Sequence, residues 1–159
     1  MNVPLEMIEP IVNNVDDPLR RLLLCYALRL TRLYQRFPQF IKEAGVFHAS
    51  IKGRVHFLRW LLSNDQEMQC PENAIDVASM YGITDVLQVW KDSGIKMRYS
   101  RFAMHAASKA GDIKCLDWWA ASGLKLKYSE TKIVKYCRLN GEVCDLWRKA
   151  VPHVFGERV

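Results

Sequence analysis

Histidine and cysteine are the residues of this chain best suited to metal binding or nucleophilic chemistry, but their spacing favours neither. The cysteines are odd in number and form no Cys-x-x-Cys pair, so we expect reduced thiols in a cytosolic or nuclear protein. The histidines form no ligand cluster with them, which argues against a zinc site. These residues are Cys25, Cys70, Cys115, Cys137, Cys144, His48, His56, His105 and His153.

Acidic residues and glycines likewise offer no catalytic arrangement. The aspartates lie scattered over predicted helix starts and solvent-facing positions, and no pair recurs in a way that suits acid–base catalysis. Neither of the common glycine-rich phosphate loops occurs. We therefore expect a protein that is not an enzyme, with no catalytic, cofactor-binding or metal-binding residues. The aspartates in question are Asp76, Asp85, Asp112 and Asp117.

The cations gather in the second half of the chain. Residues 1–80 hold 9 basic and 9 acidic residues, whereas residues 81–159 hold 14 basic and 8 acidic ones and so carry the whole net charge of +6. Residues 95–101 and 124–129 alternate apolar and basic residues, which predicts apolar side chains inward and cations outward. We expect either a solvated face or a basic stripe that binds an acidic protein partner. The stripe would contain Lys96, Arg98, Arg101, Lys125, Lys127, Lys132 and Lys135.

An internal repeat determines where these two segments fall. Aligning residues 70–100 with residues 99–129 gives 11 identities in 31 positions, where chance would give about 2. Self-similarity at a fixed period of this size indicates stacked structural repeats. The two alternating segments are therefore equivalent connections between successive repeats.

Each repeat is predicted to be two helices joined by a tight turn. The recurring core, Ala-Ser-x-x-Gly, precedes an apolar helix, and two copies end in Ser-Gly, a typical helix stop. Small Ala and Ser residues let the first helices of neighbouring repeats approach closely. Tryptophans and Cys115 on the second helices are expected to pack into the core. The cores are Ala49–Gly53, Ala78–Gly82, Ala107–Gly111 and a degenerate fourth copy, Cys137–Gly141, and the tryptophans are Trp60, Trp90, Trp118 and Trp119.

This pattern resembles the ankyrin repeat. Met104–Ser108 matches the family's Leu-His-x-Ala-Ala, and Gly123 follows Gly111 at the spacing that the family has between its two glycines. The resemblance implies a helical solenoid that binds proteins, in which His105 hydrogen-bonds between units. The family's Thr-Pro is missing, and the period is 29 residues rather than about 33. The shorter period predicts shortened connections in place of β-hairpin fingers, and such units look most like those of fungi and other microbial eukaryotes.

Residues 1–38 do not fit the repeat and predict a helical cap. Pro10 should bend or break a first short helix, and Asp16-Asp17-Pro18 is a typical helix start. From Leu19 to Phe37 the apolar residues follow one face of a single long helix. The opposite side of that helix would carry Leu24 and Leu28.

The same N-terminal segment resembles an F-box. Val3-Pro4-Leu5-Glu6 stands where the family has Leu-Pro-x-Glu, and Leu24-Cys25 stands where it has a Leu/Val-Cys pair. The tryptophan that usually follows that cysteine is absent. The resemblance implies docking to the small adaptor subunit of a cullin-type ubiquitin ligase through Pro4, Leu24 and Leu28. The alternative is a plain cap over the exposed end of the stack, which a repeat protein needs.

We therefore predict an all-α protein, an ankyrin-like helical solenoid of about four helix-turn-helix repeats with a helical N-terminal cap. The cap would span residues 1–38 and the repeat domain residues 39–159, in units of about 41–69, 70–98, 99–128 and 129–159.

The function expected first is non-enzymatic protein–protein interaction, with no cofactor, in the cytoplasm or nucleus and away from membranes. An F-box-type substrate adaptor is the second interpretation. Nucleic-acid binding through the basic stripe ranks third, because Tyr99 and Tyr128 are the only aromatic residues interleaved with it. If the stripe is only a solvated face, the binding surface should lie on the first helices around Lys52, Tyr81 and Lys109.

Overall fold

All regular secondary structure in the described part of the chain is helical. The structure is a computed structural model, and it describes residues 5–65 and 67–156. These residues form eleven α-helices, one 3-10 helix and no β-strand, which confirms the all-α prediction. The helices are α1 (Leu5–Asn13), α2 (Pro18–Ala27), α3 (Thr31–Gln35), α4 (Gln39–Ile51), α5 (Val55–Asn64), α6 (Glu72–Met80), α7 (Thr84–Asp92), α8 (Phe102–Ala110), α9 (Ile113–Ala121), α10 (Glu130–Cys137), α11 (Gly141–Ala150) and the 3-10 helix η1 (Pro152–Phe155).

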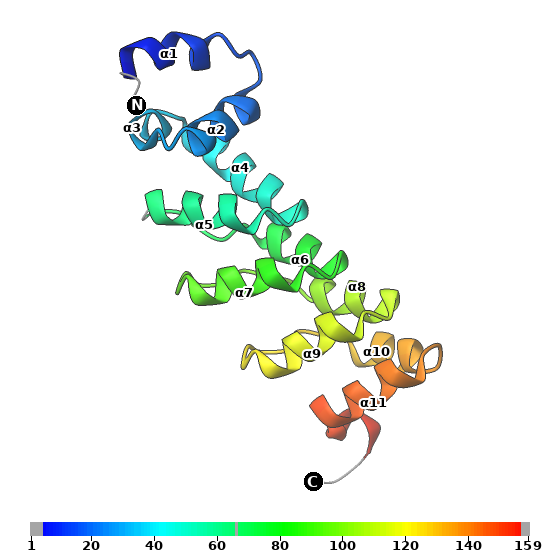
Figure 1. The fold of residues 1–159 in the computed structure, drawn as a ribbon. Helices are drawn as coiled ribbons and strands as arrows, with labels where there is room; N and C mark the ends of the chain where they lie inside the picture. Colours follow the sequence, from blue (N-terminus) through cyan, green and yellow to red (C-terminus); the bar gives the residue numbers. More distant parts are fainter. Residues whose placement is uncertain (1–4, 66, 157–159) are drawn as a thin grey trace.

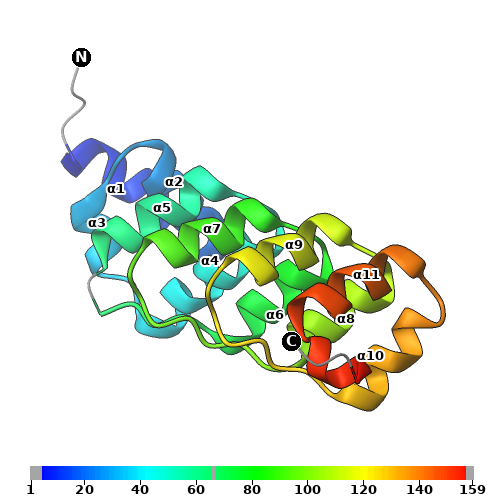
Figure 2. The same ribbon diagram turned by 90° about the horizontal axis from the view of Figure 1, so that it is seen from below.

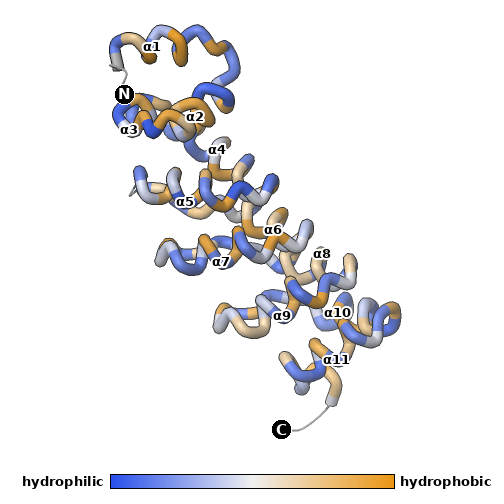
Figure 3. The backbone as a smooth tube through the Cα atoms, in the orientation of Figure 1, coloured by the Kyte–Doolittle hydropathy of each residue, from blue (hydrophilic) through white to orange (hydrophobic). Residues whose placement is uncertain are grey.

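The helices stack in two rows along the molecule. The first row holds α4, α6, α8 and α10 and the second holds α5, α7, α9 and α11, so that each helix pair lies beside the preceding one (Figure 1, Figure 2). Apolar residues recur along the helices of both rows (Figure 3). In the first row, one fully buried apolar side chain recurs at the period of the repeat, at Val46, Ile75, Met104 and Ile133.

A turn with one left-handed residue joins the two helices of a pair. Gly53, Gly82 and Gly111 have φ angles of +64°, +64° and +71°. The next residue in each case donates its N–H to the carbonyl five positions earlier, the usual closure of a glycine helix end. Successive turns also touch, because a Cβ added to Gly82 would lie 1.9 Å from Asp112 Oδ2. Backbone conformation and close stacking both require glycine here.

The same turn joins α2 to α3, where the sequence predicted one uninterrupted helix. Arg29 occupies the glycine position with a φ angle of +57°, and the Leu30 N–H donates to the Cys25 carbonyl at 2.8 Å. The predicted single helix from Leu19 to Phe37 is therefore wrong, and α2 and α3 form an additional short pair. The apolar periodicity concealed this turn because both short helices bury side chains in the same core.

The turn between α10 and α11 differs from the others. Gly141, which the sequence aligned with the turn glycines, is the first residue of α11 and has no positive φ angle. Asn140 caps α11 by accepting from the Val143 N–H at 3.2 Å, as Asp112 caps α9 through the Cys115 N–H at 2.9 Å. Asn140 comes one position earlier than the repeat period would place the counterpart of Asp112. The turn is therefore shorter, and the predicted fourth Ala-Ser-x-x-Gly copy is wrong.

Three buried hydrogen bonds between tryptophan and serine join consecutive helix pairs. Each tryptophan lies on a second-row helix and donates its indole N–H to a serine hydroxyl on the first-row helix of the preceding pair. Each serine hydroxyl donates in turn to the carbonyl four residues earlier. The pairs are Trp90 with Ser50 at 3.4 Å, Trp119 with Ser79 at 3.1 Å and Trp147 with Ser108 at 2.9 Å.

Burial confirms the packing role predicted for the tryptophans, since Trp90 and Trp119 are at most 1 % exposed. Trp147 was missed because it comes one position earlier than the repeat period would place the counterpart of Trp119. At the first pair, Leu61 occupies the tryptophan position and the contact is apolar. There the α4 backbone approaches α2 so closely that a Cβ on Gly45 would lie 2.2 Å from Leu22 Cδ2.

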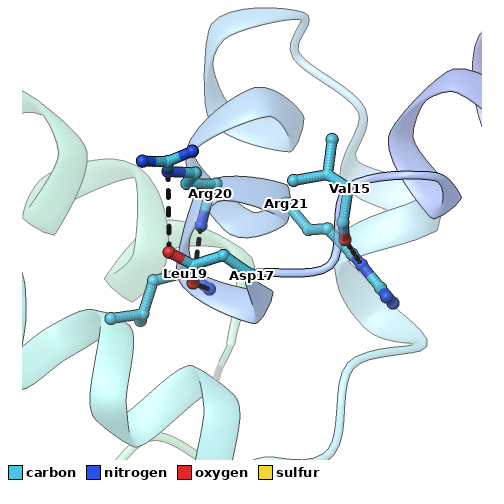
Figure 4. Close-up of polar contacts among 5 residues, drawn as sticks. All are labelled: Val15, Asp17, Leu19, Arg20 and Arg21. Carbon is cyan, nitrogen blue, oxygen red and sulfur yellow. Dashed lines mark hydrogen bonds and ion pairs between the residues drawn. The ribbon is translucent and has the colours of Figure 1, made fainter.

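Polar contacts hold the helices of the N-terminal segment in place. Asp17 caps α2 by accepting from the Leu19 N–H at 2.9 Å and pairs with Arg20, which confirms the predicted helix start (Figure 4). An ion pair between Glu9 and Arg36 joins α1 to the end of α3. Pro10 does not break α1, because the helix continues for three residues beyond it.

The three residues predicted to dock on a ligase adaptor differ in exposure. Leu28 is 47 % exposed at the end of α2. Leu24 is half-buried and packs against the core, so its predicted outward direction is wrong; the long helix whose opposite side it would occupy does not exist. Pro4 lies outside the described residues.

Two substitutions at equivalent turn positions should change stability in opposite directions. Arg29→Gly should raise the free energy of unfolding by about 1 kcal/mol, because a left-handed backbone strains any residue with a Cβ. Gly82→Ala should lower it by at least as much, because alanine acquires that strain and also collides with Asp112. Urea unfolding followed by circular dichroism measures both, and a shift of the same sign in both variants would contradict this description of the turns.

Candidate binding surface

Residues 94–100 and 123–129 connect the last three helix pairs to one another, and neither connector contains a β-strand. Their apolar side chains pack against the core, and the basic side chains between them are exposed, which confirms the predicted alternation. The packed side chains are Ile95, Met97, Leu124 and Leu126, and the exposed cations are Lys96, Arg98, Lys125 and Lys127.

A tyrosine at the end of each connector fixes it to the stack. The Tyr99 ring lies 4.8 Å from the Trp119 ring between centroids, and the equivalent Tyr128 ring lies 5.4 Å from that of Trp147. The Tyr99 hydroxyl also donates to the Lys125 carbonyl at 2.8 Å, which ties one connector to the next. Tyr99 is therefore buried and is not the exposed aromatic residue that base stacking would need.

Two polar side chains on first-row helices accept hydrogen bonds from the backbone of the connector that follows. Asp76 on α6 accepts the Ser100 N–H at 2.9 Å, and His105 on α8 accepts the Ser129 N–H through Nε2, also at 2.9 Å. The two acceptors occupy equivalent positions of successive units. His105 thus makes the hydrogen bond that the resemblance implied, whereas Asp76 is buried rather than solvent-facing as the sequence suggested.

The acceptor role requires His105 to be neutral. Burial lowers the pKa of His105 below its ordinary value of 6.5, and the positive charges of Lys132 and Arg101 lower it further. With Nε2 accepting a hydrogen bond, the ring proton resides on Nδ1.

Three of the predicted cations meet in one hollow of about 470 Å³, here called the basic hollow. Arg101, Lys125 and Lys127 line it together with Leu126, Tyr128 and Glu130. Lys127 is held in place, since its ammonium donates to the Tyr99 carbonyl at 2.6 Å and lies 4.5 Å from the centroid of that ring. None of the three cations forms an ion pair with a described residue.

A second hollow of about 490 Å³, here called the apolar groove, opens on the first-row face between the end of α6, α8 and α10. Arg101 of the basic hollow and Phe102 of the apolar groove are consecutive residues. The charged residues that line it are Lys109 and Lys132, and its apolar lining is Met80, Phe102, Ala106, Ala110 and Tyr136, with His105 beside them.

The other predicted site residues lie elsewhere. Lys96 is exposed on the first connector. Arg98 lines a separate hollow of about 390 Å³ with Phe40, Glu43 and Phe47. Lys52 and Tyr81 are exposed at the ends of α4 and α6, and Tyr81 is 63 % exposed. Three of the predicted stripe residues thus share the basic hollow, whereas Arg98 lines another hollow together with Glu43.

Metal binding and membrane insertion find no structural support in the described residues. No three His, Cys, Asp or Glu side chains among them lie together in a group that could hold a metal ion. The five cysteines are free thiols, and burial raises the pKa of Cys115 to about 12. Over residues 5–65 and 67–156, no helix has the length and apolar composition that crossing a membrane requires.

Comparison of the chain with protein-family models, with curated proteins and with solved structures finds no match.

Acid should weaken the fold through His105. Because its pKa is lower in the folded chain than the unfolded 6.5, the unfolded state takes up a proton first. The free energy of unfolding should therefore be fully retained above pH 6.5 and should fall as the pH decreases below it. In the variant His105→Asn, the amide oxygen can accept the Ser129 N–H much as the Asp76 carboxylate accepts the Ser100 N–H. This variant should make that fall smaller in urea unfolding at a series of pH values.

A second histidine, His48, should also contribute to the acid dependence of the free energy of unfolding. Burial, Arg54 and Lys52 lower the pKa of His48, so part of the acid dependence should remain in the His105→Asn variant. Superimposable pH curves for the two proteins would show that His105 does not accept the connector N–H in solution.

Proposed function

We propose that this chain is a non-enzymatic protein-binding module of the ankyrin-like solenoid type, which binds an acidic protein segment at its basic hollow. The observation that carries the proposal is the convergence of Arg101, Lys125 and Lys127 on one hollow of about 470 Å³ in the half of the chain that holds the whole net charge. Exposed cations without internal ion pairs raise the local concentration of an acidic partner and speed its association.

The ankyrin-like part of the proposal is supported by the repeated architecture. Helix pairs with a glycine turn, small residues between first-row helices and a histidine that bonds to the next connector are the features that the resemblance implies. The connectors lack hairpin fingers, so partner binding is assigned to connector side chains and to the first-row face.

Exposed apolar side chains at the N-terminus favour a second candidate surface there. Met7 and Ile11 on α1 are 65 % and 66 % exposed, and Leu28, directly after α2, is 47 % exposed. In the F-box interpretation this surface would dock on the adaptor subunit of a cullin-type ligase. That interpretation ranks second because Cys25 is fully buried and Leu24 packs against the core.

Nucleic acid ranks third as a partner. Both connector tyrosines serve the fold, since Tyr128 in the basic hollow packs on Trp147 and Tyr99 packs on Trp119. A protein partner and a nucleic acid also differ in a measurable way, because counterion release from phosphates makes equilibrium affinity fall steeply with salt.

Charge reversal in the basic hollow should weaken binding of an acidic polypeptide. Arg101→Glu with Lys125→Glu should reduce the affinity for a labelled polyglutamate peptide about tenfold, mainly through slower association. The matched control is Lys91→Glu with Lys114→Glu, which changes the net charge equally at exposed positions of α7 and α9. Fluorescence anisotropy and stopped-flow mixing over a range of salt concentrations measure both.

Two outcomes would contradict the proposal. Equal loss of affinity in both double variants would mean that net charge alone attracts the peptide and that the basic hollow is not a site. Tighter binding of a single-stranded oligonucleotide than of the peptide, with a steep salt dependence, would assign the basic hollow to nucleic acid instead.

A further inference from the structure

The apolar groove has side chains that the repeat itself does not explain. Phe102 is 48 % exposed, although the equivalent positions one unit before and after hold the polar residues Asn73 and Thr131. Met80, on the groove's opposite side, is 43 % exposed. Since the neighbouring units stack without an aromatic residue at this position, Phe102 is not a requirement of the fold.

The hollow itself arises from two small residues on α8. Ala106 and Ala110 are one helical turn apart and lie on the same face. Their counterparts on α6 are the larger Val77 and Tyr81, one unit earlier. The combination leaves about 490 Å³ with an apolar floor and with Lys109 and Lys132 as its charged residues. A fitting occupant presents apolar side chains with carboxylates beside them.

Helix α1 of the same chain has this composition. Met7 and Ile11 lie one turn apart on one face and are 65 % and 66 % exposed, while Ile8 and Val12 pack inward. Residues 1–19 contain four acidic residues and no lysine or arginine. Glu6 is exposed beside Met7, whereas Glu9 is already paired with Arg36.

We propose that the apolar groove binds α1 of a second copy of this chain, with Met7 and Ile11 in the groove and Glu6 facing Lys109 and Lys132. Helix α1 and the groove lie toward opposite ends of the stack, so one copy cannot satisfy both (Figure 1). The contact is therefore head-to-tail and joins two different surfaces. Each added copy leaves one free α1 and one free groove, so the assembly grows with concentration, either as an open chain or until the rotation between copies closes a ring of three or more.

Sedimentation velocity of the full chain over a wide range of concentration tests this association. The weight-average mass should rise beyond that of a dimer, because two copies joined head-to-tail still have one free α1 and one free groove. Ile11→Lys should abolish the rise by removing the occupant, and Lys109→Glu with Lys132→Glu should abolish it by repelling the occupant. Both variants should retain the helical circular dichroism of the unmodified chain, because all three side chains are exposed.

Mixing the two variants distinguishes head-to-tail contact from other modes of association. The Ile11→Lys protein keeps an intact groove and the Lys109→Glu, Lys132→Glu protein keeps an intact α1, so the mixture should form a dimer and nothing larger. A mixture that stays monomeric would overturn the proposal, as would an unmodified chain that is monomeric at every concentration or forms a closed dimer.

A peptide experiment covers the case in which a variant fails to fold. A labelled peptide of residues 5–15 should bind the unmodified chain, and Phe102→Ser should weaken that binding at least as much as Lys109→Glu does. Equal binding of the peptide to the unmodified chain and to the Phe102→Ser variant would contradict the proposal. The inference does not rest on the basic hollow, since Lys125→Glu leaves the groove lining unchanged and should leave self-association intact.

Discussion

A buried indole N–H must find a hydrogen-bond acceptor, and this requirement sets how one helix pair lies on the next. Trp90, Trp119 and Trp147 are the largest fully buried side chains, and an indole N–H is costly to bury without a partner. A serine hydroxyl on the preceding first-row helix accepts the indole N–H, at Ser50, Ser79 and Ser108. The same hydroxyl donates its proton to the carbonyl four residues earlier. A placement of two helix pairs that satisfies both groups recurs at three successive interfaces.

That placement fixes the surfaces on which any partner must bind. Stacking in one register brings each turn glycine against the next turn, as at Gly82 and Asp112, and aligns the connectors along one edge. Asp76 and His105 then hold the connectors from inside, and Tyr99 joins one connector to the next. The cations of the basic hollow are therefore placed by a buried polar network, and Lys127 is held in addition by its own contacts with Tyr99.

The sequence could predict what depends on local conformation. Glycines at a regular spacing indicated the turns, and alternation of apolar and basic residues indicated the connectors, because both signals come from neighbouring residues. The α2–α3 turn escaped because an arginine adopts the left-handed conformation there, and a shortened turn hid Trp147 outside the register of the repeat. The partner of Asp76 and the apolar groove could not be predicted, since both combine residues from different helices.

The coupling between Ser79 and Trp119 tests most directly whether the buried hydrogen bond organises the stack. In a double-mutant cycle of Ser79→Ala and Trp119→Phe, the two effects on the free energy of unfolding should be non-additive by about 1 kcal/mol. Ser122 provides the control, because its hydroxyl bonds to the carbonyl of Trp119 and not to the indole, so Ser122→Ala should be additive with Trp119→Phe. Additive effects in the Ser79 cycle as well would contradict the account.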